Sequence, residues 1–175
     1  MKPLSFRKAK KPSVNITVDE NKGFYRHKDL KLDDVKYLVG EDYVQSRHWN
    51  INGKREIYLL KPRRGESLEH FFLIWNIAEH LNKISNKLEL FETTKPDIVF
   101  NIGKKKYAVE VETGKVYTKD KKKFHAKIKA LNQSYGNNWF FVVTNRDFAP
   151  IYGRFGKTFT RQNFLKQFEK WIKNN

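Results

Sequence analysis

Residues 95–112 read KPDIVFNIGKKKYAVEVE, and this stretch decides the fold because it predicts a β-hairpin. Two runs rich in apolar residues flank Gly103 and Lys104. Glycine at the first central position suits a two-residue type II′ turn. The turn sets a register in which Asp97 lies opposite Glu110. The sequence therefore predicts two facing acids on neighbouring strands.

Three acids share one face of this predicted hairpin. Opposite residues on antiparallel strands have Cβ atoms roughly 4.5–5.5 Å apart, and Glu112 points to the same face as Glu110, about 7 Å further along. Carboxylates this close are unfavourable unless a cation lies between them. Because oxygen-rich sites suit Mg²⁺ or Mn²⁺, Asp97, Glu110 and Glu112 predict a divalent-metal site. An ordinary half-exposed strand with alternating Val and Glu is the alternative.

The composition indicates a folded domain that binds a polyanion. Of 175 residues, 39% are hydrophobic, which is enough to fill a core. Lys and Arg number 36 against 19 Asp and Glu, giving a net charge of +17, and such a surface favours nucleic acid over an anionic membrane. No apolar run approaches the roughly 20 residues of a spanning helix, and no signal peptide is evident. We expect a cytoplasmic, DNA-associated protein, and the absence of cysteine excludes disulfides and thiolate metal sites.

The chain divides into three predicted segments. Residues 1–18 form a flexible basic arm that either holds DNA or is a solvated tail. Residues 19–62 form an extension made of a helix and a hairpin, and residues 63–175 form the core. The boundary falls at KPRRG, residues 61–65, because Pro and Gly interrupt regular structure there.

Within the extension, apolar spacing predicts a helix over residues 32–39. Asn52 and Gly53 are a strong hairpin signal, and they set Trp49 opposite Glu56. A helix followed by a basic hairpin is either the wing of a winged DNA-binding element or an edge hairpin that covers the core.

The core begins with a long buried helix that Ser67 is expected to cap. Glu69, near its start, is either a surface acid or a fourth carboxylate of the site. A lysine-rich helix over about residues 120–134 suggests phosphate contacts. The apolar run at 138–144 predicts a strand buried on both faces, and Thr160 is expected to open a final amphipathic helix.

The order helix, hairpin, helix, buried strand, with Pro-Asp at 96–97 and Glu110-Val111-Glu112 ending the second strand, resembles the PD-(D/E)xK nuclease superfamily. The resemblance covers roughly residues 66–144 and is nearest to Holliday junction resolvases and small nucleases of viruses or mobile elements. It implies an α/β fold with a restriction-endonuclease-like αβββαβ core, a mixed central sheet flanked by helices. It also implies a DNA endonuclease that uses Mg²⁺ or Mn²⁺ and acts on duplex or branched DNA. Because resolvases of this type cut paired strands as dimers, a homodimer is an expected assembly.

In that family an aspartate and the first acid of the second strand bind metal, which corresponds here to Asp97 and Glu110. The carbonyl of Val111 is the usual additional ligand, and Glu69 is the positional match to a glutamate from the preceding helix. The third signature residue is normally lysine, whereas this chain has Glu112. The catalytic cation must therefore come from elsewhere, or a second metal must replace it.

Two lysines are candidates for that cation: Lys115, just past the strand, and Lys127, on the following helix. Lys95 lies opposite Glu112 in the predicted register, so a salt bridge that merely neutralises the glutamate is a third interpretation. The candidate catalytic residues are thus Asp97, Glu110, Glu112, Lys115 and Lys127, and the candidate DNA contacts are Arg55, Arg63, Arg64, Lys104, Lys105, Lys121, Lys122 and Lys123.

A DNA-binding protein that has lost catalysis on the same core is the alternative function. Glu112 would then mark the loss, and the hairpin at Asn52 and Gly53 would be the binding element. RNA binding is a third hypothesis, but the aromatic residues fall mostly at core spacing, so the sequence predicts no stacking platform.

Overall fold

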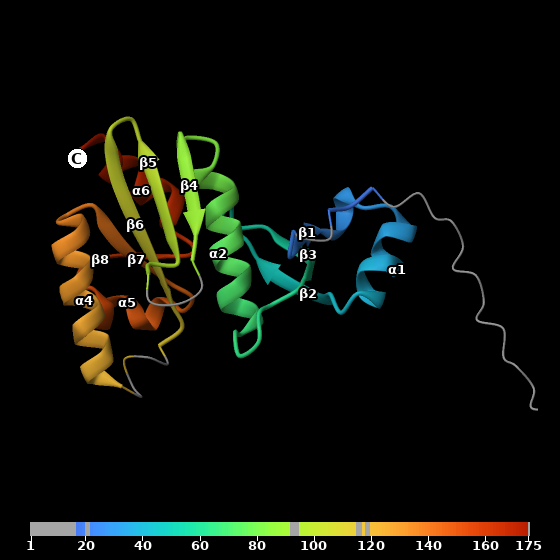
Figure 1. Cartoon of the computed structure of the whole chain (residues 1–175), viewed down its shortest axis with the longest axis horizontal. Coiled ribbons are helices and arrows are strands. Elements are labelled where there is room, and N and C mark those ends of the chain that lie inside the picture. The colour runs from blue at the N-terminus through green and yellow to red at the C-terminus, as the bar shows by residue number, and fades with distance from the viewer. Residues whose placement is uncertain (1–16, 20–21, 92–94, 115–116, 118–119, 175) are drawn as a thin grey trace, which may run out of the picture.

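A computed structural model describes residues 17–19, 22–91, 95–114, 117 and 120–174. They form a mixed α/β fold with a three-stranded sheet, β1-β3-β2, and a five-stranded sheet, β4-β5-β6-β7-β8 (Figure 1). The elements are β1 (Phe24–Arg26), η1 (His27–Asp29), α1 (Leu32–Gly40), β2 (Val44–Trp49), β3 (Arg55–Leu60), α2 (Leu68–Leu81), β4 (Lys87–Leu90), β5 (Ile98–Ile102), β6 (Lys105–Glu112), α4 (Lys121–Tyr135), β7 (Trp139–Val143), η2 (Arg146–Phe148), α5 (Ala149–Tyr152), β8 (Lys157–Thr160) and α6 (Phe164–Lys173).

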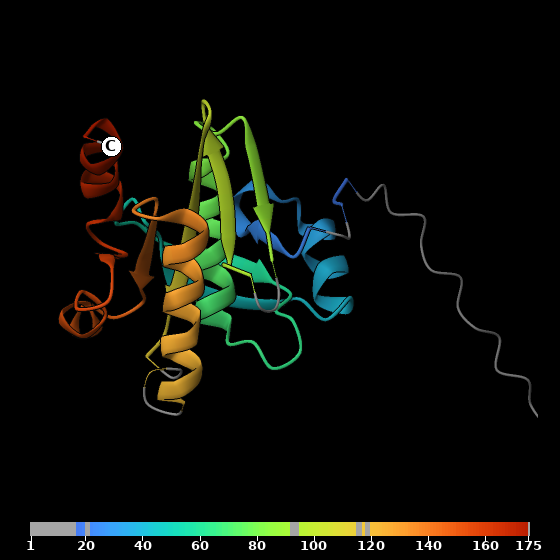
Figure 2. The ribbon, with the colours of Figure 1, turned by 60° about the vertical axis from the view of Figure 1, so that its left-hand side comes forward.

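The five-stranded sheet is mixed and carries helices on both faces. Strands β4, β5 and β6 pair antiparallel, whereas β6, β7 and β8 pair parallel. Helices α2 and α4 lie on opposite faces of it (Figure 2). Every residue of β7 is buried, which confirms the strand predicted from the apolar run.

Helix α2 lies between the two sheets (Figure 1). Its Phe72 ring contacts Tyr58 of β3, with ring centroids 4.8 Å apart, and one core cluster joins both residues to Val109 of β6. This continuous core spans the predicted break at residues 61–65. Ser67 caps the helix as predicted, since its hydroxyl accepts a hydrogen bond from the backbone N–H of His70.

The central hairpin has the predicted register. Phe100 pairs with Tyr107 and Ile102 with Lys105. Gly103 has a φ of 59°, which the first central residue of a type II′ turn requires. The helices predicted before and after it are also confirmed, as is the helix at residues 32–39.

The pairing predicted for the N-terminal hairpin is wrong by one residue. Trp49 pairs with Arg55 rather than with Glu56. The Asn50 side-chain oxygen accepts the backbone N–H of Lys54 at 2.9 Å, and this closes a longer loop than the two-residue turn that was expected.

This longer loop packs on α2. Ile51 is buried, and its backbone N–H donates to Asn76 Oδ1 at 2.8 Å. The hairpin therefore covers the core, as the edge-hairpin interpretation expected.

The start predicted for the last helix is also wrong. Thr160 ends strand β8, and α6 begins at Phe164. The backbone N–H of Thr160 donates to Asn163 Oδ1 at 2.8 Å, which closes a turn between strand and helix. In the described part of the chain, no helix is both long and apolar enough to cross a membrane.

Candidate functional site

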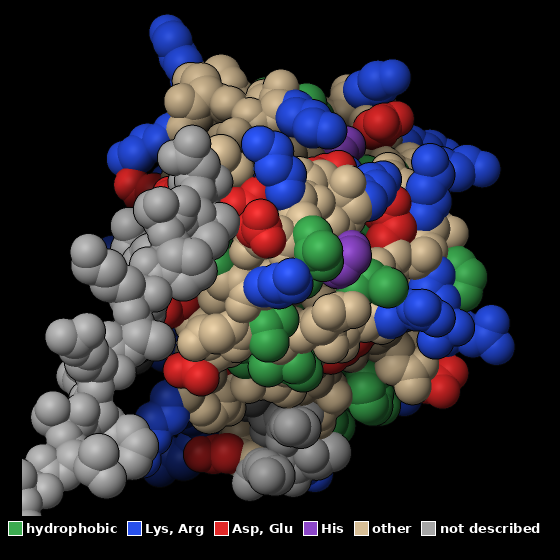
Figure 3. Space-filling view, turned by 90° about the vertical axis from the view of Figure 1, so that its right-hand side faces the viewer, with side chains coloured by type: hydrophobic (Ala, Val, Ile, Leu, Met, Phe, Trp, Pro, Cys, Tyr) green, Lys and Arg blue, Asp and Glu red, His purple; other side chains and the backbone are tan. Residues whose placement is uncertain are grey.

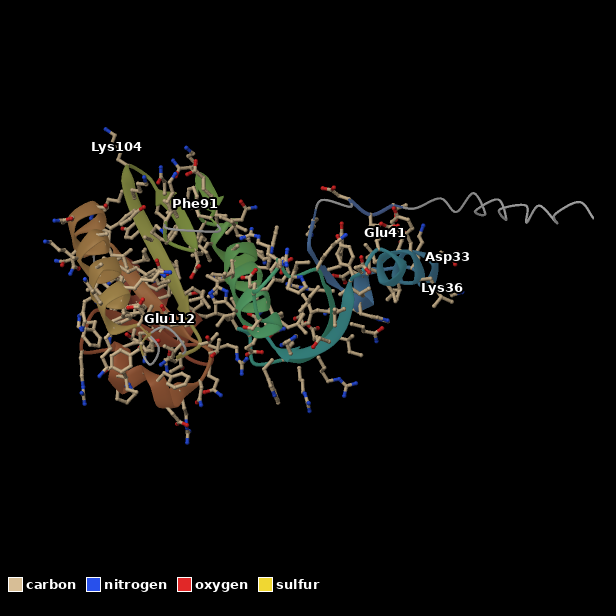
Figure 4. All side chains as sticks on the ribbon, turned by 60° about the horizontal axis from the view of Figure 1, so that its bottom comes forward. Asp33, Lys36, Glu41, Phe91, Lys104 and Glu112 are labelled. Carbon is tan, nitrogen blue, oxygen red and sulfur yellow. The ribbon has the colours of Figure 1, made fainter. Side chains whose placement is uncertain are left out.

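Two buried acids lie on the face of β6 that packs against α4. Glu110 is 1% exposed and Glu112 is 3% exposed. Because side chains alternate along a strand, both share their face with Ala108, which packs in one cluster with Phe124 of α4. Figure 4 shows Glu112 inside the five-stranded half of the molecule, while Lys104 at the hairpin tip projects outward.

Lys127 of α4 supplies a cation to these acids. Its ammonium group forms an ion pair with Oε2 of Glu110 and lies 4.0 Å from Oε1 of Glu112. Burial disfavours the charged form, but the neighbouring Glu110 and Asp97 carboxylates outweigh burial and raise the pKa of Lys127. The other candidate, Lys115, lies outside the described residues.

Lys95 does not neutralise Glu112. Its ammonium group lies 4.4 Å from the centroid of the Phe91 ring instead. Glu112 is held by Tyr152 of α5, whose hydroxyl donates to Oε2 at 3.0 Å. Burial raises the pKa of Glu112, against the opposing effects of Lys127 and this hydrogen bond. No sequence pattern marked Tyr152, because it comes from a four-residue helix.

Asp97 lies just before β5 and contacts the end of β6. Its Oδ2 accepts the backbone N–H of Val111 at 2.7 Å and lies 3.6 Å from Nε2 of His70. His70 Nε2 is also 3.1 Å from the Val111 carbonyl oxygen, and its Nδ1 is 2.7 Å from Oε1 of Glu66. Burial disfavours the imidazolium, but the carboxylates of Asp97 and Glu66 raise the pKa of His70 to about 10. Sequence reasoning missed His70, whose only signal was its spacing of four residues from Glu66.

Glu69 is not brought to the other acids. His48 Nδ1 lies 2.9 Å from its Oε2, and Arg161 binds its Oε1. The hydrogen bond with His48 contributes most to lowering the pKa of Glu69. His70 is the residue of α2 that meets Asp97. Because successive residues of an α-helix are about 100° apart around its axis, Glu69 points in another direction.

Glu110 carries an unsatisfied oxygen. Among the described residues, Oε1 of Glu110 has no hydrogen-bond partner. Burial and the nearby Asp97 carboxylate raise the pKa of Glu110 well above its ordinary value of 4.5, although Lys127 opposes this shift. A buried polar atom without a partner is costly, so a cation shared by Glu110 and Asp97 fits here.

The two carboxylates would suit a metal ion that is bound mainly through water and substrate. Within the residues that the structure describes, no group of three or more His, Asp or Glu side chains is arranged to bind a metal ion. Mg²⁺ usually keeps several water molecules and is bound through one or two carboxylates plus substrate phosphate. Two carboxylates, Asp97 and Glu110, therefore match that mode of binding.

The candidate DNA contacts divide between the two ends of the core. Two basic segments lie at the same end as the last residues of β6: the loop with Arg63 and Arg64, and the first turn of α4, residues 121–123 (Figures 1 and 2). The hairpin tip with Lys104 and Lys105 lies at the opposite end. The visible part of the face at the small sheet carries Lys and Arg interspersed with Asp and Glu (Figure 3). The end with the acids thus combines carboxylates with two basic segments, while Arg55 lies on β3 of the small sheet.

Comparison of the chain with protein-family models, with curated proteins and with solved structures finds no match.

Proposed function

We propose that the protein is a metal-dependent DNA endonuclease that hydrolyses phosphodiester bonds on a restriction-endonuclease-like core. The single observation that carries the proposal is the buried Glu110, near the Asp97 carboxylate, with an unpartnered oxygen and a lysine at its side. A carboxylate pair can hold a metal ion that would activate water and polarise a phosphoryl oxygen, and an adjacent cation can stabilise the charge that develops there. The order α2, β4, β5, β6, α4, β7 along the described residues is consistent with the implied core.

In this proposal Asp97 and Glu110 hold Mg²⁺ or Mn²⁺, which would lower the pKa of a bound water and polarise the phosphoryl oxygen. His70 fixes the Asp97 carboxylate. Lys127 stabilises negative charge that develops on the phosphate. Glu112, held by Tyr152, orients the Lys127 ammonium group from 4.0 Å and takes the position where the family has lysine.

The basic segments at this end of the core would hold the DNA backbone. Arg63 and Arg64 precede α2, and Lys121, Lys122 and Lys123 form the first turn of α4. Phosphate contacts carry no sequence information. The arrangement therefore favours recognition of DNA shape, such as a branch, over recognition of a base sequence.

The test is cleavage of supercoiled, linear, single-stranded and four-way-junction DNA with Mn²⁺, with Mg²⁺ and with EDTA. We expect metal-dependent cutting that falls at least about 100-fold in Asp97→Asn and in Glu110→Gln. Asp33→Asn is the matched control, because Asp33 is an exposed acid on α1 at the far end of the molecule (Figure 4). Unchanged cutting in both site variants would refute the proposal.

A non-catalytic DNA-binding protein is the second candidate, and two observations favour it. Lys127 already neutralises Glu110, and His70 already occupies the Val111 carbonyl that the family resemblance implies as a ligand. This candidate predicts salt-sensitive DNA binding, no cleavage with any divalent metal, and unchanged DNA affinity in Asp97→Asn and Glu110→Gln.

A further inference from the structure

A cavity of about 340 Å³ opens beside Glu110 and Lys127. It lies between α4 and the outer strands of the five-stranded sheet. Val99 of β5 and Leu131 of α4 contribute apolar side chains to its lining. The cavity has the size of sites that take a small organic ligand, so something larger than a metal ion fits next to the acids.

The cavity exists because α4 leaves part of the sheet uncovered. Helix α4 packs on β6 and β7, while β4 stands clear of it at the edge of the sheet (Figure 2). By strand alternation, Glu89 and Val99 lie on the same face as Glu110. A second cavity of about 120 Å³ shares Glu89, Val99 and Lys106 with the first and continues to Lys87. Together they form a groove that runs from the acids to the sheet edge.

Aromatic rings and ammonium groups line this groove in pairs. The Nζ atom of Lys95 lies 4.4 Å from the centroid of the Phe91 ring, and Nζ of Lys106 lies 5.6 Å from that of Tyr135. Both rings are only partly buried. Proteins that bind single-stranded nucleic acid combine aromatic rings with basic side chains, because bases stack on the rings while the basic groups contact the phosphates.

We propose that the cavity binds one unstacked nucleobase of the strand being cut, while the phosphate attached to that nucleotide lies at Glu110 and Lys127. This inference rests on the proposed nuclease function and names its substrate class. The substrate is DNA with unpaired nucleotides at the cut site, such as a single strand, a flap or an open branch point. A base within a continuous duplex must first be flipped out, at the cost of its stacking and pairing.

The test compares two octanucleotides of equal charge, a normal single strand and an abasic strand with the same phosphates. Their affinities are measured by fluorescence anisotropy in EDTA, so that cleavage does not enter. We expect the wild-type protein to bind the normal strand at least about fivefold more tightly. Phe91→Ala and Tyr135→Ala should bring the ratio of the two affinities close to one, while the affinity for the abasic strand stays unchanged.

Trp49→Ala is the matched control, because Trp49 is a half-exposed aromatic residue on the small sheet. Phe91→Leu keeps apolar volume but removes the ring, so it separates stacking from packing if Phe91→Ala folds poorly. A preference that survives in the folded Phe91 and Tyr135 variants, or that Trp49→Ala removes, overturns the inference.

The inference and the proposed function fail separately. Metal-dependent cleavage with no preference for the base-containing strand leaves the nuclease in place and overturns the base pocket. A base preference that depends on Phe91, with no cleavage under any metal, supports the pocket and refutes the nuclease.

Discussion

The Tyr152 hydroxyl donates a 3.0 Å hydrogen bond to Oε2 of Glu112, which ties α5 to β6 where both side chains are buried. A buried carboxylate without a partner is unfavourable. This bond, together with the Lys127 ammonium group 4.0 Å from Oε1, therefore accounts for how the fold accommodates a glutamate at the end of β6.

Tyr152→Phe should destabilise the protein, because it leaves Glu112 buried with one partner fewer. We expect a loss of about 1–3 kcal/mol in the free energy of unfolding, measured by urea denaturation at pH 7. Tyr107→Phe is the control, since Tyr107 is equally buried and its hydroxyl has no hydrogen-bond partner among the described residues. Equal losses in the two variants would contradict a specific role for the Tyr152 bond.

Lys127 and Glu110 should be coupled in stability. Lys127→Met leaves Glu110 buried without its cation and should lower the free energy of unfolding by about 1–3 kcal/mol. This is less than the loss expected when a fully buried ion pair is broken, because the glutamate can take up a proton. Adding Glu110→Gln removes the stranded acid, so the double variant should be more stable than Lys127→Met alone. Urea denaturation of the four proteins in this double-mutant cycle measures the coupling, and strictly additive costs would show that the two side chains act independently.

Asp34 should make stability depend on acidity. Thr17 donates a backbone and a hydroxyl hydrogen bond to this buried carboxylate, and the backbone bond contributes most to lowering the pKa of Asp34 below its ordinary 3.8. A lowered folded pKa stabilises the native state above the unfolded pKa, and this contribution disappears as the pH falls through the folded value. Asp34→Asn should therefore cost about 1–2 kcal/mol at pH 7 and progressively less below about pH 4. Urea denaturation from pH 7 to pH 3 measures this cost, with Asp33→Asn on the exposed neighbour as the control variant. A cost of Asp34→Asn that does not change with pH would contradict the prediction.

The two basic ends of the core should contribute unequally to DNA binding. Replacing Lys121, Lys122 and Lys123 with Gln should lower DNA affinity and reduce the slope of log K against log salt by about 0.9 for each phosphate that the protein no longer neutralises. Replacing Lys104 and Lys105, which lie at the opposite end of the hairpin, should change the slope little. The slopes are obtained from DNA affinities measured between about 50 mM and 200 mM salt. Equal slopes for the two variants would contradict the placement of DNA at the end of the core that carries Glu110 and Glu112.

Local signals explain what the sequence predicted correctly. The register of the central hairpin follows from period-two alternation and from the turn at Gly103, and the start of α2 follows from Ser67. Both depend on residues only a few positions apart. The one-residue error at the other hairpin has a local cause too, since the Asn50 side chain closes the loop in place of a tight turn.

The remaining features depend on contacts between distant elements. His70 contacts Val111, which is 41 residues away in the sequence. Tyr152 contacts Glu112, which is 40 residues away. Pattern analysis gives the helices but not which side chains they bring together. Glu69 illustrates this: α2 is apolar on nearly every side, so its periodicity did not fix which side of its first turn faces Asp97.

The position of α2 between two sheets constrains how the sequence can vary. Phe72 packs on Phe24 and Tyr58 of the small sheet, while other positions of the helix pack on β5 and β6. A change of side-chain volume on either side of α2 shifts the helix against both sheets at once, because protein interiors are close-packed. Relatives that differ in α2 should therefore carry compensating changes in strands from both halves of the chain, and the two halves are expected to diverge together rather than separately.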